Sequence, residues 1–544
     1  MNKTIKNTIN AFTGLLTISL PLSVLGTVNS NHNNNNITNL QNTNIASSYQ
    51  APTTLEELRK ANVNDLITLD KYDSRNYGIV GAVRDQETSE LCWAYAAASS
   101  AETNILRKNL LPNYNYTNLD ISEYDIAYLA KQRTSEADKL GLTAKDIIDL
   151  PVDYGANSFV STSTLTQWNA PNLQTSGTFK PVYDSIALLD DTTYIEKVDS
   201  ENSNFYNQIE SVKEAIARYG AVTLSFTANQ SLYTAKYYNS EDGSERIGEH
   251  IANIVGWDDT ISKDLYTKPA TLDGGWIIKN SWGDGFHEAG YFYMSYDSFI
   301  YDVWGYDFVS TDKYENNYYY DGINQPVGGY SSKTFGDKFG VIFPTLRSTE
   351  ENKEKLKAIS VGIKGNDVTV DVQIYTNVDA NLADPKNLSN NPENGKLATS
   401  TKQTFKYPGY HTIQLPKTIE LDPNSNFAVV ITLSNPNNDA EILLSYEDES
   451  VNDMTFFTTT TGWQNTKIEH KGYTDLVARI KAFTTTKESI DDNQNGEDNT
   501  STNKGPSTTL IIGATAGAIG GGIVIGSAIG ATVLVRKKKI KKAK

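Results

Sequence analysis

Cysteine is almost absent from this sequence: Cys92 is the single cysteine in 544 residues. One cysteine cannot form an intramolecular disulfide, so no such cross-link can stabilise the chain. Basic side chains are also fewer than acidic ones, with 48 Lys and Arg against 65 Asp and Glu and a formal net charge of −17. Because phosphate binding requires a basic face, this charge argues against a nucleic-acid partner.

Long apolar runs lie near the two ends of the sequence. Residues 1–26 combine two lysines with an apolar run and small residues, an order that is typical of a signal peptide. Residues 509–535 carry no charge and are long enough to cross a bilayer, and residues 536–544 are strongly basic. By the positive-inside rule we expect one transmembrane helix, a cytoplasmic tail and an extracellular remainder at a cell membrane.

Composition divides the sequence between these ends into four segments. Residues 27–68 begin rich in Asn, Thr and Ser, which indicates a spacer that can include a short pro-segment. Residues 69–310 and 311–485 are two globular regions, and the acidic, polar residues 486–508 form a linker.

Hydrophobic periodicity and turn residues predict the elements of both globular regions. In the first region the expected helices are 92–108, 122–131 and 211–219, and the expected strands are 221–227, 251–257, 275–279 and 290–295. In the second region the expected strands are 358–363, 368–375, 410–415, 427–433, 442–445 and 476–483. This order favours an α+β domain followed by an all-β sandwich or jelly roll. A capping box at 54–57 predicts a further short helix through residue 60.

Cys92 stands at the start of an Ala-rich run, in which Tyr95, Ala98 and Ile105 have roughly helical spacing. A thiolate at a helix N-terminus is favoured by the positive end of the helix dipole and by unpaired backbone N–H groups. The alternative interpretation is a small buried apolar side chain, as is usual for a free cysteine. A nucleophilic role would require a base close to the thiol.

Two of the five histidines, His250 and His287, lie in the same region as Cys92. His250 opens a buried strand, so its ring can project from the strand end. His287 lies in a polar loop that contains glycine, where we expect it to be exposed. We therefore predict that His250 is the base.

Four motifs occur in one order along the chain: Gln86, Cys92-Trp93-Ala94, His250-Ile251-Ala252 and Asn280-Ser281-Trp282-Gly283. Together they resemble the papain-like cysteine peptidases, whose two-lobed fold the resemblance implies for residues 69–310. The resemblance implies that Cys92 is the thiolate nucleophile and His250 its imidazolium partner. It also implies that Asn280 orients the imidazole, and that the Gln86 side chain and the Cys92 N–H form the oxyanion hole.

The same resemblance extends to substrate binding. Residues 153–157 resemble the family's glycine-containing edge, which implies that Gly155 and Ala156 pair with the substrate backbone. Trp282 would shield the histidine–asparagine hydrogen bond from water. Glu90 and Leu91 depart from the family pattern, which has small residues beside the nucleophile. The resemblance therefore implies the catalytic chemistry but does not imply the shape of the substrate subsites beside Cys92.

Residues 315–322, Glu-Asn-Asn-Tyr-Tyr-Tyr-Asp-Gly, resemble the start of the lectin-like domain of bacterial surface cysteine peptidases. This resemblance implies contact with cell-envelope glycan or a surface protein, in some members with bound calcium. The alternative is a structural sandwich that only spaces the first domain from the membrane.

These inferences lead to one expected function, a cell-surface cysteine endopeptidase that hydrolyses protein or peptide substrates through a thioester. Catalysis would require no cofactor and no metal. Two alternatives stay open. One is an envelope transpeptidase or amidase that uses the same Cys–His pair, and the other is a non-catalytic adhesin that acts through the β domain.

Overall fold

The computed structural model describes residues 49–487, apart from 133–138, 141, 143–150, 176–180, 241–248, 323–328, 332–337, 388, 447–453 and 467–475. The expected signal peptide, the transmembrane helix and the basic tail lie outside the described residues. Within the part of the chain that is described, no helix has the length and apolar character needed to cross a membrane.

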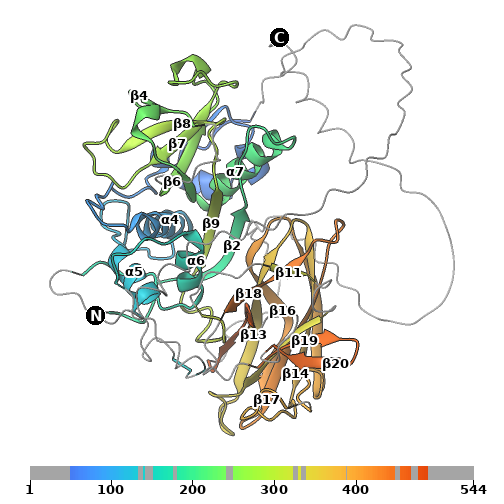
Figure 1. Cartoon of the computed structure of the whole chain (residues 1–544). Helices are drawn as coiled ribbons and strands as arrows, with labels where there is room; N and C mark the ends of the chain where they lie inside the picture. Colours follow the sequence, from blue (N-terminus) through green and yellow to red (C-terminus); the bar gives the residue numbers. More distant parts are fainter. Residues whose placement is uncertain are drawn as a thin grey trace, which may run out of the picture. The chain divides into compact units, whose positions relative to one another are not determined.

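Helices are concentrated in the N-terminal half (Figure 1). They are α2 (Leu55–Lys60), α3 (Val63–Leu66), α4 (Cys92–Lys108), α5 (Glu123–Lys131), α6 (Ser158–Thr166) and α7 (Phe205–Tyr219), with 3-10 turns η1 (Ser74–Tyr77), η3 (Gln230–Leu232) and η4 (Lys263–Leu265). The capping box of α2 is confirmed, because the side chains of Thr54 and Glu57 each accept the other residue's backbone N–H. Helix α4 has the expected bounds and ends at Asn109, which adopts the left-handed conformation that terminates helices.

A nine-stranded sheet lies beside these helices. Its strands are β1 (Lys71–Asp73), β2 (Leu188–Ile195), β3 (Val222–Thr227), β4 (Tyr233–Thr234), β5 (Tyr237–Tyr238), β6 (Glu249–Asp258), β7 (Gly275–Lys279), β8 (Tyr291–Ser295) and β9 (Asp302–Val309). The strand order is β2-β9-β3-β6-β7-β8-β5-β4, with β1 paired to β6. Helix α4 packs against β6 and β9.

The C-terminal half is an all-β sandwich, as expected (Figure 1). One sheet has the order β10-β22-β13-β18-β11, with β16 on β13 and β21 on β18, and the other has the order β15-β14-β17-β12-β19-β20. The strands are β10 (Asn316–Tyr318), β11 (Gly329–Ser331), β12 (Lys338–Pro344), β13 (Glu354–Lys364), β14 (Val368–Thr376), β15 (Lys396–Phe405), β16 (Gly409–Leu421), β17 (Asn426–Ser434), β18 (Glu441–Tyr446), β19 (Thr455–Thr459), β20 (Gly462–Asn465), β21 (Leu476–Ala478) and β22 (Ile480–Thr485). Side chains from both sheets share one apolar core.

Apolar side chains also join the two halves. Trp168, which follows α6, stacks on Tyr314 at 5.7 Å and packs on Phe483 at 4.3 Å between ring centroids. The core of the N-terminal half includes Leu58 and Leu66 from the segment in which we expected a spacer or pro-segment. Helices α2 and α3 are therefore part of the folded N-terminal half.

Several elements of the N-terminal half differ from the sequence-based expectation. Helix α7 begins at Phe205, six residues before the expected start, and strands β2 and β9 were not expected. Helix α6 was also missed, because Ser and Thr occupy the positions where an amphipathic helix has apolar residues. Strand β2 was missed because Asp190 and Asp191 interrupt its apolar pattern. Lys313 lies outside the sheet and forms an ion pair with Asp190, with 2.7 Å between Nζ and Oδ2.

Candidate active site

Cys92 is the first residue of α4, and the preceding residue Leu91 makes no side-chain capping hydrogen bond. The first N–H groups of the helix are therefore not occupied by a cap. Burial raises the pKa of the Cys92 thiol, and the backbone N–H groups of Ile251 and Trp93 oppose this effect by hydrogen bonding. Since Ile251 follows His250 in β6, the thiol lies where the start of α4 meets the start of β6.

The imidazole of His250 is buried, with 5% of the residue exposed. Its Nε2 lies 2.8 Å from Oδ1 of Asn280, which follows β7. The indole of Trp282 stacks on the imidazole with 4.7 Å between ring centroids, and Phe226 of β3 packs edge-on at 5.7 Å. Burial lowers the pKa of His250 to about 4, and the hydrogen bond to Asn280 opposes this shift.

The protonation of the ring follows from a third contact. Oδ1 of Asn280 also accepts the backbone N–H of Ser281 at 2.9 Å, so this atom is an oxygen acceptor. Nε2 of His250 must then carry the proton that it donates to Asn280. Nδ1 of the neutral ring is left as the nitrogen that can accept a proton.

The Gln86 side chain is tied to the same segment. Its Oε1 accepts the Ser281 hydroxyl at 2.6 Å, and its Nε2 donates one hydrogen to the carbonyl of Ser89 at 2.8 Å. A primary amide has two N–H hydrogens, so one remains for another acceptor. The backbone N–H of Gln86 donates to the carbonyl of Ser281 at 2.8 Å, which fixes the two loops together.

The expected substrate edge contacts a residue that departs from the family pattern. The N–H of Gly155 donates to Oε2 of Glu90 at 2.9 Å, and the N–H of Glu90 donates to Oδ1 of Asp153 at 2.8 Å. Ala156 is partly buried against the core of the N-terminal half. The sequence did not reveal this Glu90–Gly155 contact, because the two residues are 65 positions apart.

The second histidine candidate is elsewhere. His287 is exposed, as expected, and its ring packs against Tyr233 and Phe286 at 4.7 and 4.0 Å between centroids. Among the described residues, none of its ring contacts is to Cys92, His250 or Asn280.

A cluster of buried charges lies behind the site and was missed by sequence reasoning. Arg84 contacts Glu102 at 2.7 Å and Glu123 at 3.5 Å, and these groups line a cavity of about 20 Å³ together with Lys279 and Asn280. Burial raises the pKa of Glu123 to about 7 and lowers the pKa of Lys279 to about 8. The sequence signal that could have indicated this cluster was Lys279, a charged residue at the end of the apolar strand 275–279.

The described residues gather no group of three or more His, Cys, Asp or Glu side chains that could hold a metal ion. The donor set for the calcium expected in the β sandwich is therefore not found among them, and that site stays a prediction.

Two family models match the chain. Residues 162–303 match the papain family cysteine protease model, a span that contains His250 and Asn280 but neither Cys92 nor Gln86. Residues 317–484 match the lectin like domain model.

Curated relatives are similar over less than half of the chain. Digestive cysteine proteinase 3 of Homarus americanus is 21% identical over 231 residues, which are 41% of this chain and 60% of that protein. Fruit bromelain of Ananas comosus is 21% identical over 234 residues, 41% of this chain and 54% of that protein. The chain thus spans a little over half the length of these two relatives.

Two solved structures share the fold of both halves. A cysteine-to-alanine variant of the clostridial cysteine protease Cwp84 after propeptide cleavage has a TM-score of 0.59 and 18% identity, covering 77% of this chain and 99% of that one. The cysteine protease and lectin-like domains of Cwp84, a surface layer associated protein of Clostridium difficile, have a TM-score of 0.57 and 19% identity, covering 79% and 90%. The chain therefore matches the papain family cysteine protease model and the lectin like domain model in that order, and it shares the fold of these two structures.

Proposed function

We propose that this protein is a cell-surface cysteine endopeptidase that hydrolyses peptide bonds through a thioester at Cys92. The observation that carries the proposal is the hydrogen bond between His250 and Asn280. It forms next to Ile251, whose backbone N–H contacts the Cys92 thiol. A buried, oriented imidazole beside a thiol at a helix start is the arrangement that nucleophilic catalysis by cysteine requires.

In the acylation step Cys92 transfers its proton to Nδ1 of His250, and the sulfur attacks the peptide carbonyl carbon. Burial disfavours each charge alone, but the transfer creates opposite charges together and brings no net charge into the site. The remaining N–H of the Gln86 amide and the Cys92 N–H would donate to the developing oxyanion. His250 then gives its proton to the leaving amine as the C–N bond breaks.

In the deacylation step water replaces the amine. His250 takes one proton from the water, whose oxygen attacks the thioester carbon, and the carboxylic acid leaves as the C–S bond breaks. The proton on His250 returns to the sulfur, so the enzyme is restored. Asn280 keeps the ring oriented throughout, and the stacked indole of Trp282 excludes water from their hydrogen bond.

Peptide substrates would run along the edge at Gly155 and Ala156. A peptide backbone that pairs with Gly155 competes with Oε2 of Glu90 for the same N–H. We propose that the protein is held at the cell membrane by residues 509–535, with residues 27–508 extracellular and the basic tail cytoplasmic. The lectin-like domain would then contact cell-envelope glycan or a surface protein.

The test is cleavage of casein and of envelope peptides by the purified protein and its variants. Cys92→Ser and His250→Ala should abolish cleavage, and His287→Ala is the matched control because it removes an exposed histidine. Cleavage by Cys92→Ser at the wild-type rate would refute the nucleophile. Incorporation of an added amine into the product would indicate transpeptidation, and absence of both cleavage and epoxide labelling would favour an adhesin.

Localisation has its own test. Protease added outside intact cells should digest residues 27–508 and leave the tail protected. Recovery of the protein from the soluble fraction, with the tail intact, would contradict the proposed membrane anchor.

A further inference from the structure

Helix α6 is built from residues that do not favour helices. Its sequence, Ser-Phe-Val-Ser-Thr-Ser-Thr-Leu-Thr, is dominated by β-branched residues and by serines that compete for backbone hydrogen bonds. Ser161, Thr162 and Ser163 are nevertheless buried, with at most 1% of each residue exposed. Contacts from other elements must therefore hold this segment in its helical form.

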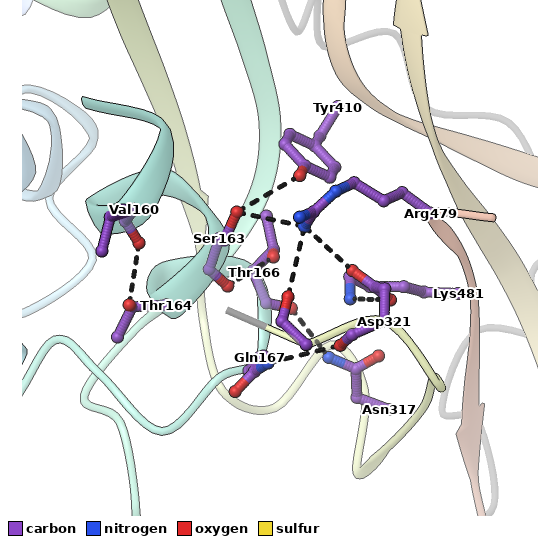
Figure 2. Close-up of polar contacts among 11 residues, drawn as sticks. Val160, Ser163, Thr164, Thr166, Gln167, Asn317, Asp321, Tyr410, Arg479 and Lys481 are labelled. Carbon is purple, nitrogen blue, oxygen red and sulfur yellow. Dashed lines mark hydrogen bonds and ion pairs between the residues drawn. The ribbon is translucent and has the colours of Figure 1, made fainter. Parts of the chain in front are cut away.

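Elements α4, α5 and β2 of the N-terminal half pack against α6. The lectin-like domain adds contacts at the C-terminal end of α6, as Figure 2 shows. Nδ2 of Asn317 donates to the carbonyl of Thr166 at 2.9 Å, which satisfies one of the last carbonyls of the helix. Nη1 of Arg479 donates to the hydroxyl of Ser163 at 3.1 Å. The hydroxyl of Tyr410 lies 3.5 Å from the same oxygen of Ser163.

Charge complements this end of the helix. Arg479 and Lys481 are buried with Asp321, which Lys481 contacts at 2.6 Å and Arg479 at 3.3 Å (Figure 2). The guanidinium of Arg479 is the cation that contacts α6 directly, through the hydroxyl of Ser163. A positive charge near a helix C-terminus is favourable because the helix dipole is negative there.

The N-terminus of α6 directly follows the expected substrate edge. Asn157 caps the helix, and its Oδ1 accepts the N–H groups of Phe159 and Val160 at 3.1 and 3.2 Å. Gly155 and Ala156 immediately precede this cap. A nine-residue helix is about 13 Å long. Asn317 and Arg479 therefore contact α6 about 13 Å from the substrate edge.

We propose that the lectin-like domain positions the substrate edge of the peptidase domain through α6, and that Asn317 and Arg479 are positioning residues for substrate binding. The inference rests on the proposed peptidase function, because Gly155 and Ala156 are substrate contacts only in that function. It assigns to the lectin-like domain a role inside the chain, besides any contact with the cell envelope.

The test compares the full-length wild-type protein with Asn317→Ala and Ser163→Ala in detergent. Each substitution removes contacts to the last turn of α6 and leaves the Asp321 charge cluster in place. Loss of one such hydrogen bond should raise KM for a peptide that spans the edge by about two- to tenfold. The kcat value and the rate of Cys92 alkylation by iodoacetamide should change less than KM.

The matched control is Lys406→Met, which removes a different contact between the two domains. Nζ of Lys406 contacts Oε2 of Glu214 on α7 at 2.5 Å, and Glu214 keeps Arg218 as a partner in the variant. This control should leave KM unchanged. An increase in KM equal to that of Asn317→Ala would overturn the proposal, because general loosening between the domains would then explain both.

A second measurement does not depend on peptide cleavage. Amide hydrogen exchange in residues 153–166 should accelerate by about two- to tenfold in Asn317→Ala and stay unchanged in Lys406→Met. Unchanged exchange in Asn317→Ala overturns the positioning role. Faster exchange in a protein that cleaves no peptide would instead refute the proposed peptidase function and keep the link between Asn317 and the edge.

Discussion

Oδ1 of Asn280 lies between two hydrogen-bond donors, Nε2 of His250 at 2.8 Å and the N–H of Ser281 at 2.9 Å. The backbone N–H can only donate, so Asn280 must accept from the imidazole. This relationship assigns the ring proton to Nε2 and the basic lone pair to Nδ1.

Asn280→Ala should lower kcat/KM for a peptide substrate by about 10²-fold, since a misplaced catalytic group costs rates of that order. The ring of His250 would lose the side-chain oxygen that accepts its Nε2–H and would rotate more freely against Trp282. The measurement is steady-state kinetics together with thermal unfolding of the variant. An unchanged kcat/KM in a folded variant would show that Asn280 does not orient the base.

The second prediction concerns the pH at which Cys92 reacts. Burial raises the pKa of the thiol above its ordinary value of 9.0. A thiol with a pKa of 9.0 is about 1% ionised at pH 7, and this buried thiol is ionised less. Without a base its alkylation should therefore be at least about 10²-fold slower than that of a full thiolate. In His250→Ala the rate of iodoacetamide labelling should therefore rise only at alkaline pH.

The wild-type protein should be labelled at neutral pH, because His250 can take the thiol proton. The exposed histidine variant His287→Ala is the control and should follow the wild-type profile. Identical pH profiles for wild type and His250→Ala would exclude His250 as the base.

The third prediction concerns the oxyanion. Gln86→Glu keeps the shape of the side chain and an oxygen that can accept from Ser281, but it removes the amide N–H donors. Loss of one oxyanion donor should lower kcat by about 10²–10³-fold with a smaller effect on KM. Peptide hydrolysis and circular dichroism would be measured together. A folded variant with wild-type kcat would contradict the role of Gln86.

The fourth prediction concerns stability. Burial raises the pKa of Glu123 from its ordinary 4.5 to about 7, although Arg84 opposes the shift. The folded state then holds the proton more tightly than the unfolded state. The favourable contribution is complete below the unfolded pKa near 4.5 and is lost as pH rises through about 7.

Glu123→Gln should remove this dependence, which amounts to about 3 kcal/mol at most. The free energy of unfolding of the wild type should fall relative to the variant between pH 4.5 and 7, as measured by urea denaturation at several pH values. Parallel curves for the two proteins across that interval would refute the raised pKa.

The sequence was sufficient for elements whose pattern is local. The Ala-rich run placed α4 at Cys92–Lys108, and the apolar segment 275–279 placed β7, because periodicity and propensity act over neighbouring residues. The motifs around Cys92, His250 and Asn280 indicated the chemistry for a similar reason, since each motif is contiguous.

Tertiary structure decided what depends on distant partners. Helix α6 has no helical pattern of its own. It packs against α4, α5 and β2, and Asn317 and Arg479, more than 150 residues further along the chain, bind its last turn. Glu90 meets Gly155, and Arg84 meets Glu102 and Glu123, only after folding. The physical reason is that burial and charge pairing are properties of the packed chain, whereas propensity and spacing are properties of the sequence.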